Sequence, residues 1–395
     1  MVWMLAAACV ACTEAPLIVP GGQARLNNPV SMAFVGNNLA VVASANVGLT
    51  QVAGSLMPVD LANRKLLPDT AIPIPNFAGK MAVDTDPSRP RIYIADRGDD
   101  AILVYSYSIP GTSTAISFSA VDAPTPQNRG PSGTIANAIM ADSNPFDVTF
   151  VPGTPSGDLL IATNNLSGSV TVVPAATLAP IDLNPEDGLL NGLILFSAAN
   201  FRIKESRPGL GANELVPTAD GTLYFITSTR TSDIYVFDPK DLKVEGMVDL
   251  SAIAASPGTR GMAVAQNGLA YIVQRALNAV VVLDVAGIRD DGNDYKVIDP
   301  KVVDLILVGK DPEGVALSKD ETKIFVSNEG DNSVSVIDTT TRALLRKIAI
   351  PGSAPSRLVR EPTRDANGVL YVLNFLSNNI TLLDLTTGDL LGTIE

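Results

Sequence analysis

Two short apolar runs joined by a polar turn recur along the chain. The clearest copy is KIFVSNEGDNSVSVID, residues 323–338. Runs of this kind, rich in β-branched residues and separated by a few polar residues, predict an antiparallel hairpin. Six further segments share the pattern: LAVVASANVGLTQVAGSLMPVD, RIYIADRGDDAILVYS, LLIATNNLSGSVTVVP, LYFITSTRTSDIYVFD, AYIVQRALNAVVVLD and LYVLNFLSNNITLLD. Five copies close on an aspartate, which we interpret as structural because its carboxylate can accept backbone N–H bonds in the next turn. These aspartates are Asp60, Asp238, Asp284, Asp338 and Asp384.

A further apolar strand precedes each hairpin and another follows it. GVALS at 314–318 and ALLRKIAI at 343–350 flank the clearest copy. Four antiparallel strands form one twisted sheet with two apolar faces, which only neighbouring sheets can cover. Ring closure covers every face, so we predict an all-β fold, a seven-bladed β-propeller of four-stranded antiparallel blades. An open β-solenoid would show shorter and more uniform repeats. The expected blades span residues 25–75, 76–142, 143–206, 207–256, 257–310, 311–350 and 351–395.

The sixth expected blade carries a family resemblance. Residues 312–350 (PEGVALSKDETKIFVSNEGDNSVSVIDTTTRALLRKIAI) resemble the YVTN β-propeller repeat of bacterial cell-envelope proteins, with IFVSN in place of the Tyr-Val-Thr-Asn strand. Blades 4, 5 and 7 match more loosely and blades 1 to 3 in outline, so the resemblance covers most of the chain after Gly22. It implies the fold and a cell-envelope setting, whereas the architecture itself hosts many activities. The segment PLIVP at 16–20 either adds a closing strand to the last blade or stays in a tether.

The N-terminal segment MVWMLAAACVACTEAPLIVPGG is apolar up to its second cysteine. The apolar run is too short to span a bilayer and suits the core of a secretory signal. Small residues before a cysteine resemble the lipobox of bacterial lipoproteins. We predict lipidation at Cys12, with Cys9 as the alternative register and a plain cleaved signal peptide as the alternative to both. Residues 1–12 are then the signal, 13–24 the tether and 25–395 a single propeller. In that family Thr13 after the cysteine implies the outer membrane, so we expect an exported, membrane-anchored lipoprotein of the bacterial envelope.

Composition removes several classes of function. The 395 residues carry a formal net charge of -13, which argues against a nucleic-acid binder. There is no histidine, and the two cysteines both lie in the N-terminal segment. A Ser-His-Asp triad, a Cys-His pair and a His-ligated zinc site are therefore excluded. No catalytic residue, resident metal or cofactor is predicted. The acidic turn RDDGND at 289–294 lacks the spacing of an EF-hand loop. A divalent cation in the central funnel is an open alternative.

One face of a propeller carries both the turns between second and third strands and the segments that enter each next blade. We call it the front face, and its polar residues are the candidate ligand-binding set, with solvated turn residues as the alternative reading. Two long insertions, 122–146 and 197–213, are expected to open on it. The candidates are Lys80, Asp96, Arg97, Asp147, Asn164, Arg207, Glu214, Arg230, Arg260, Arg275, Glu313, Asn328 and Arg357.

Three functions fit these observations. The first is a non-enzymatic binding or scaffolding module, monomeric and held on the membrane by its lipid only, whose front face binds an envelope protein, a glycan or a small molecule. The second is a hydrolase resembling the lactonase propellers, using Glu214, Glu313, Arg260 and Arg357. The third is the large subunit of a quinoprotein dehydrogenase. A deep pocket with a strongly perturbed Glu214 or Glu313 would favour the enzyme.

Overall fold

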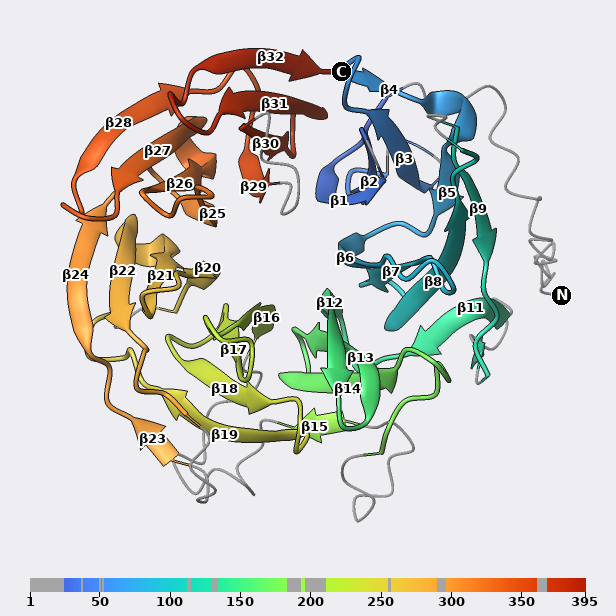
Figure 1. Cartoon of the computed structure of the whole chain (residues 1–395), viewed down its shortest axis with the longest axis horizontal. Helices are drawn as coiled ribbons and strands as arrows, with labels where there is room; N and C mark the ends of the chain where they lie inside the picture. The colour runs from blue at the N-terminus through green and yellow to red at the C-terminus, as the bar shows by residue number, and fades with distance from the viewer. Residues whose placement is uncertain are drawn as a thin grey trace, which may run out of the picture.

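Seven antiparallel sheets stand around a central channel (Figure 1). The computed structural model describes residues 25–36, 38–49, 51, 53–111, 115–124, 126–128, 134–182, 193–195, 211–254, 257–289, 296–360 and 368–395. The prediction of an all-β, seven-bladed propeller is confirmed. The signal, the tether and the segment 16–20 lie outside the described residues.

The first three blades contain the following strands, from the channel outward. Blade 1 has β1 (Pro29–Gly36), β2 (Leu39–Ser44) and β3 (Gly54–Asp60), with β4 (Lys65–Leu66) and β5 (Ile72–Ile74) sharing the outer place around the 3-10 turn η1 (Pro68–Thr70). Blade 2 has β6 (Ala78–Asp84), β7 (Arg91–Asp96) and β8 (Ala101–Ser108), with β9 (Ser117–Ala120) and β11 (Thr134–Met140) outside and β10 (Pro126–Asn128) beside β11. Blade 3 has β12 (Pro145–Thr154), β13 (Gly157–Asn164), β14 (Ser169–Pro174) and β15 (Leu193–Leu195).

The other four blades follow the same order. Blade 4 has β16 (Ala212–Pro217), β17 (Tyr224–Ser228), β18 (Ile234–Asp238) and β19 (Lys243–Val248). Blade 5 has β20 (Thr259–Val264), β21 (Leu269–Gln274), β22 (Ala279–Asp284) and β24 (Val302–Leu307), with η3 (Arg275–Leu277) after β21. Blade 6 has β25 (Pro312–Leu317), β26 (Lys323–Asn328), β27 (Ser333–Asp338) and β28 (Leu344–Ala349), with η4 (Glu329–Asp331) after β26. Blade 7 has β29 (Pro355–Arg360), β30 (Val369–Asn374), β31 (Asn379–Asp384) and β32 (Leu390–Ile394).

Two outer strands depart from the simple repeat. Residues 122–146 were expected to form a long loop on the front face, but β11 in this segment pairs with β8 as part of the outer edge of blade 2. That expectation is wrong for this part of the insertion, because the pairing with β8 places it on the rim. In blade 5, β23 (Lys296–Ile298) crosses to the neighbouring sheet and pairs in parallel with β19.

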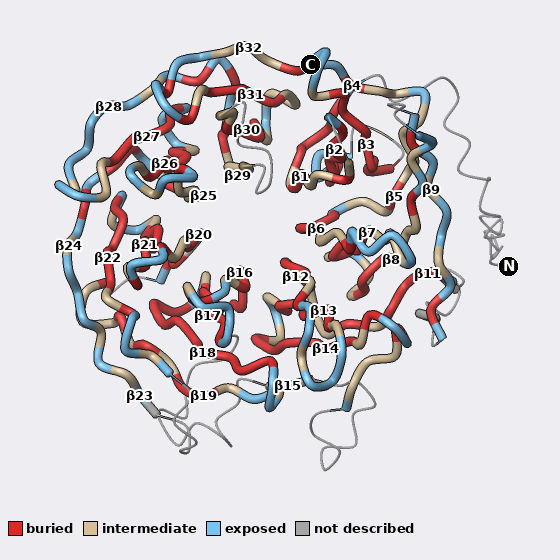
Figure 2. Tube along the Cα trace, viewed as in Figure 1, coloured by how far each residue is buried: buried red, intermediate tan, exposed pale blue. Residues whose placement is uncertain are grey.

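The core lies between neighbouring blades. Second and third strands are buried along almost their whole length, whereas the outer strands β24 and β28 are largely exposed and β32 is mostly half-buried (Figure 2). The aspartates at the ends of third strands are structural, as predicted. Asp338 Oδ1, for example, accepts the backbone N–H groups of Thr340 and Thr341 at 3.0 and 2.7 Å. Asp384 repeats this arrangement with the next two threonines.

Blades 1 and 7 close the ring by packing and hydrogen bonds. Blade 7 is built from four consecutive strands, and its second and third strands share a buried cluster with β2 and β3 of blade 1. The backbone N–H of Asn28 donates to Asn378 Oδ1 at 2.8 Å, and its amide donates to the carbonyl of Phe375 at 3.1 Å. Arg64 donates to the carbonyl of Leu391 at 2.7 Å on the outer side. Apolar contact between terminal blades therefore replaces a shared strand among the described residues.

Candidate functional site

The third residue of every inner strand occupies an equivalent place at the channel. Each inner strand starts in register with the end of its second strand, and the pairing then shifts. Such an irregularity re-aims a side chain. We call the seven residues at this place the third-position ring. Its members, from blade 1 to blade 7, are Ser31, Lys80, Asp147, Glu214, Gly261, Gly314 and Arg357.

Four charged members of the ring form one ion-pair network. Lys80 Nζ lies 2.7 Å from Glu214 Oε1 and 3.3 Å from Asp147 Oδ2. Arg357 Nη1 donates to the same Glu214 oxygen at 2.5 Å. Strand β16, which carries Glu214, and strand β29, which carries Arg357, face one another across the channel in Figure 1. The pair therefore links blade 4 to blade 7 across the channel. The Lys80 side chain is only 6% exposed and that of Glu214 only 11%, so water screens this network weakly.

The network fixes the protonation state of Glu214. Burial alone would raise the pKa of Glu214, but the charges and hydrogen bonds of Lys80 and Arg357 outweigh it and lower the pKa to about 2. Burial and the nearby Arg357 lower the pKa of Lys80, while Asp147 and Glu214 act in the opposite direction. Glu214 is therefore ionised at neutral pH.

A cavity of about 510 Å³ begins at this ring. Its described lining comes from the third to the sixth residues of the inner strands, down to Val83, Phe150, Pro217 and Arg360. Those residues lead to the turns between first and second strands, on the face opposite the front face, which we call the back face. The sequence placed the site at the front face, whereas this cavity lies on the other side of the ring. Its size is that of small-molecule sites.

A second charged cluster lies on the front-face side of blades 5 and 6. Arg275 Nη1 donates to Glu313 Oε2 at 2.7 Å and to Glu329 Oε2 at 2.6 Å, and its Nε lies 3.6 Å from Asp311. Arg260 Nε lies 3.2 Å from Glu313 Oε2. Burial raises the pKa of Glu313 even though both arginines act to lower it. The Glu313 side chain is 25% exposed. None of these five residues lines the 510 Å³ cavity.

Two predicted site residues stabilise their own blades. The amide of Asn328 donates to Ser333 Oγ and Ser335 Oγ at 2.9 and 3.0 Å, and its oxygen accepts the N–H of Gly309 at 3.0 Å. Asn164 makes the equivalent two donations in blade 3. Both asparagines are fully buried, so these side chains tie the second strand to the third and do not reach a ligand surface.

The remaining candidates lie apart from the ring network. Asp96 is buried and accepts the N–H of Gly98 at 3.2 Å. Arg97 donates to Asn144 at 3.2 Å, and its guanidinium lies 5.1 Å from the centre of the Phe146 ring. Arg230 is exposed in the turn after β17. Arg207, Cys9 and Cys12 lie outside the described residues, as does most of the insertion 197–213.

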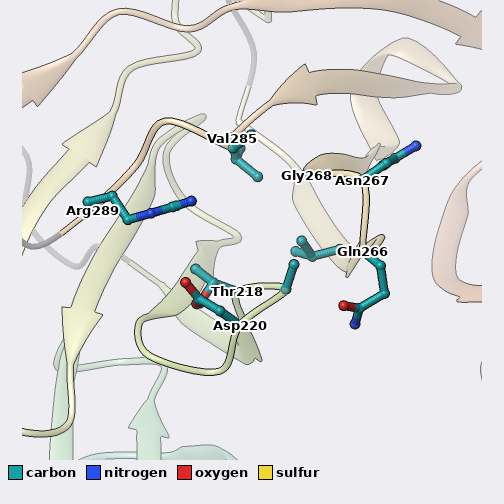
Figure 3. A pocket seen from close by; sticks show the side chains of 10 residues that line it. Thr218, Asp220, Gln266, Asn267, Gly268, Val285 and Arg289 are labelled. Atoms are coloured by element: carbon teal, nitrogen blue, oxygen red, sulfur yellow. The ribbon is translucent and has the colours of Figure 1, made fainter.

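Sequence reasoning missed two features. Ser31 belongs to the ring and could have been found by its offset from the following hairpin. A pocket of about 260 Å³ lies between blades 4 and 5 on the back face, with Arg289 and Asp220 on one side and Gln266 and Asn267 on the other (Figure 3). Hydrogen bonds from the Thr218 hydroxyl and from the backbone N–H and hydroxyl of Thr222 lower the pKa of Asp220 to about 2.

No group of three or more histidines, cysteines, aspartates or glutamates in the described part of the chain is placed to hold a metal ion. No helix within the described ranges is long and apolar enough to cross a membrane.

Comparison with known proteins places the chain by fold. No protein-family model matches it, and no curated protein does. Among solved structures, the β-propeller domain of Cps50 (Swd1) from Myceliophteria thermophila matches with a TM-score of 0.60 at 9% identity, over 91% of this chain and 96% of that one. The chain shares the β-propeller fold. A Lactobacillus plantarum protein matches with a TM-score of 0.55 at 17% identity, over 82% and 86% of the two chains. Streptogramin B lyase matches at 0.57 and 12% identity, over 90% and 93%. At these identities the likeness shows the fold alone.

Proposed function

We propose that this propeller is a non-enzymatic binding module of the bacterial cell envelope, of the YVTN-repeat kind. A lipid on Cys12 holds it on the outer membrane, and its ligand occupies the central cavity below the third-position ring. Its partner is an envelope protein, a glycan or a small molecule. The acidic propeller acts as a monomer.

The observation that carries this proposal is that the glutamate with a raised pKa, Glu313, lies outside the lining of the cavity. A general acid or base works best with a pKa near the operating pH. Glu214 does line the cavity with a strongly shifted pKa, the combination expected to favour an enzyme, but Lys80 and Arg357 shift that pKa down to about 2, away from neutral pH. Glu313 has a raised pKa, but it lies outside the cavity lining and is paired with Arg260 and Arg275. Glu214 thus offers a ligand in the cavity a charged contact and is not tuned for proton transfer.

The binding test is capture of a partner by the full-length protein. The protein is cross-linked in envelope preparations and purified, and the bound material is identified by mass spectrometry. Arg360→Glu reverses a charge in the cavity lining, and Lys65→Glu makes the same change on the exposed strand β4. We expect the first variant to lose the captured material and the second to keep it. Capture that is irreproducible, or equally retained by both variants, contradicts the proposal.

The anchor is tested by metabolic labelling with an alkyne-tagged palmitate. Cys12→Ser should abolish the label and release the protein from membranes, whereas Cys9→Ser should leave both unchanged. Label that survives Cys12→Ser would move the modification to the other cysteine, and its absence from the unmodified chain would refute lipidation.

A lactonase-like hydrolase is the second candidate, and the raised pKa of Glu313 is the observation that favours it. Glu313 would take a proton from water attacking a lactone carbonyl, with Arg260 stabilising the oxyanion. Turnover of a lactone panel that is lost in Glu313→Gln, with folding intact by circular dichroism, would establish this reaction. No turnover with any lactone would eliminate it.

A further inference from the structure

Two side chains of the third-position ring cap a backbone N–H of the next blade. Ser31 Oγ in blade 1 accepts the N–H of Met81 in blade 2 at 3.1 Å. Asp147 Oδ2 in blade 3 accepts the N–H of Leu215 in blade 4 at 3.2 Å. Met81 and Leu215 are both the fourth residue of their inner strands, so the fourth-position N–H groups point away from their own sheets. An inner strand is an edge strand, and these are its unpaired donors.

Glycine removes the cap in blades 5 and 6. A Cβ on Gly261 would lie 3.1 Å from the nitrogen of Val315 and 2.9 Å from the oxygen of Glu313. A Cβ on Gly314 would lie 3.4 Å from the nitrogen of Leu358 and 2.8 Å from a neighbouring carbonyl oxygen. These backbones approach too closely for a side chain. No ring oxygen can therefore cap the N–H groups of Val315 and Leu358, and both residues line the 510 Å³ cavity.

The charge of the cavity favours an anion at these donors. Its described lining carries three cations, Lys80, Arg357 and Arg360, and two carboxylates, Asp147 and Glu214. The lining is thus net positive in a chain whose formal charge is -13. Arg357 directly precedes Leu358 and uses one terminal nitrogen for Glu214, and a guanidinium has further donors to offer.

We propose that this sector of the channel, between blades 5, 6 and 7, binds a small molecule that carries a carboxylate and a second hydrogen-bond acceptor. The carboxylate accepts from the N–H of Leu358 and from the Arg357 guanidinium, and the second acceptor takes the N–H of Val315. Charge-assisted bonds of this kind are about twice as strong as neutral ones. The inference rests on the proposed binding function and names the ligand class for its cavity.

The experiment compares, in one sample, Leu215, which Asp147 caps, with Leu358, whose preceding ring position is the glycine Gly314. The full-length protein is labelled with ¹⁵N-leucine, and the signals of Leu215 and Leu358 are assigned by conservative leucine-to-isoleucine replacement of each. Lactate, succinate, benzoate and citrate are titrated, each beside its amide. We expect at least one acid to move the Leu358 amide proton downfield and saturably, while Leu215 and every amide titration stay still. If no acid moves Leu358, or if both leucines respond equally, the proposal is overturned.

A variant tests the charged part of the site. Gly314→Ser would imitate the cap of blade 1, but its close backbone contact endangers folding. Arg357→Gln keeps the shape and leaves Lys80 on Glu214, and we expect it to weaken acid binding by about tenfold or more. Lys65→Gln, on the outer strand, should leave binding unchanged. An unaltered affinity in Arg357→Gln contradicts the site. Capture of a macromolecule without acid binding would keep the proposed binding function and eliminate the carboxylate site. Acid binding without capture would keep the carboxylate site and eliminate a scaffolding role.

Discussion

Replacing Glu214 by glutamine tests the ion pairs that bridge the channel. Glu214 Oε1 accepts from Lys80 and from Arg357 at 2.7 and 2.5 Å. Glutamine has nearly the same shape but no charge, so the change removes the electrostatic part of both contacts and leaves packing almost intact. Lys80 keeps Asp147 as a partner at 3.3 Å, whereas Arg357 loses the only ion pair that the described residues give it.

The magnitude follows from the pKa of Glu214. It falls from an ordinary 4.5 to about 2 on folding, and each pH unit corresponds to about 1.4 kcal/mol. The ionised carboxylate thus stabilises the fold by about 3 kcal/mol, to order of magnitude. Because the folded-state pKa is depressed, this stability is present above pH 4.5 and is lost as the pH falls towards 2. Glu214→Gln should therefore cost about 3 kcal/mol at pH 7 and little near pH 2.

The assay is urea unfolding followed by circular dichroism from pH 7 down to pH 2.5. Glu395→Gln, at an exposed carboxylate, is the matched control and should shift the free energy of unfolding by less than about 0.5 kcal/mol throughout. A Glu214→Gln penalty that stays constant over this pH range would refute the linkage. A penalty below about 0.5 kcal/mol at pH 7 would show that the desolvation of the pairs cancels their attraction.

Three further predictions address the blade clamps, the front-face cluster and ring closure. Asn328→Ala removes three hydrogen bonds in a fully buried site and should cost about 3 kcal/mol in urea unfolding; a loss below about 1 kcal/mol would contradict the clamp. Arg275→Gln should raise the pKa of Glu313 further, because it removes a cation 2.7 Å away. A ¹³C-glutamate NMR titration that shows no rise would argue against this pairing. Asn378→Gly, chosen because Asn378 has a φ of 58°, removes the oxygen that accepts the Asn28 N–H between blades 7 and 1 and should cost about 1 kcal/mol in urea unfolding. An unchanged free energy of unfolding would show that this contact does not contribute to closing the ring.

The repeat in the sequence was sufficient to predict the architecture. Apolar runs such as 323–328 and 333–338 became the second and third strands, which are buried on both faces and so admit little variation. The outer strands were harder to predict because their exposed faces tolerate almost any residue. β23 illustrates this, since nothing in KVI at 296–298 indicates pairing with blade 4 rather than blade 5. The same holds for β11, which lies at the outer edge of blade 2 in a segment that was expected to be a loop.

The site was predicted as a set of residues but not as an arrangement. Lys80, Asp147, Glu214 and Arg357 were all candidates, because each stands where an inner strand begins. Their meeting depends on a register shift in each inner strand, which the hydrophobic pattern does not record. The same shift separates them from Glu313, one residue earlier in its strand, and so divides the candidates into the ring and the front-face cluster.

In a closed ring of equivalent sheets, a position that differs from blade to blade stands out against the repeat. Structural contacts recur between blades, as the buried asparagine clamps of blades 3, 6 and 7 illustrate. The third position of the inner strand has no such common duty, since it carries serine, lysine, aspartate, glutamate, glycine and arginine around one channel. Packing alone would select one small residue there seven times. The mixture reflects contacts that differ around the ring, with ion pairs among Lys80, Asp147, Glu214 and Arg357 and close backbone approach at Gly261 and Gly314.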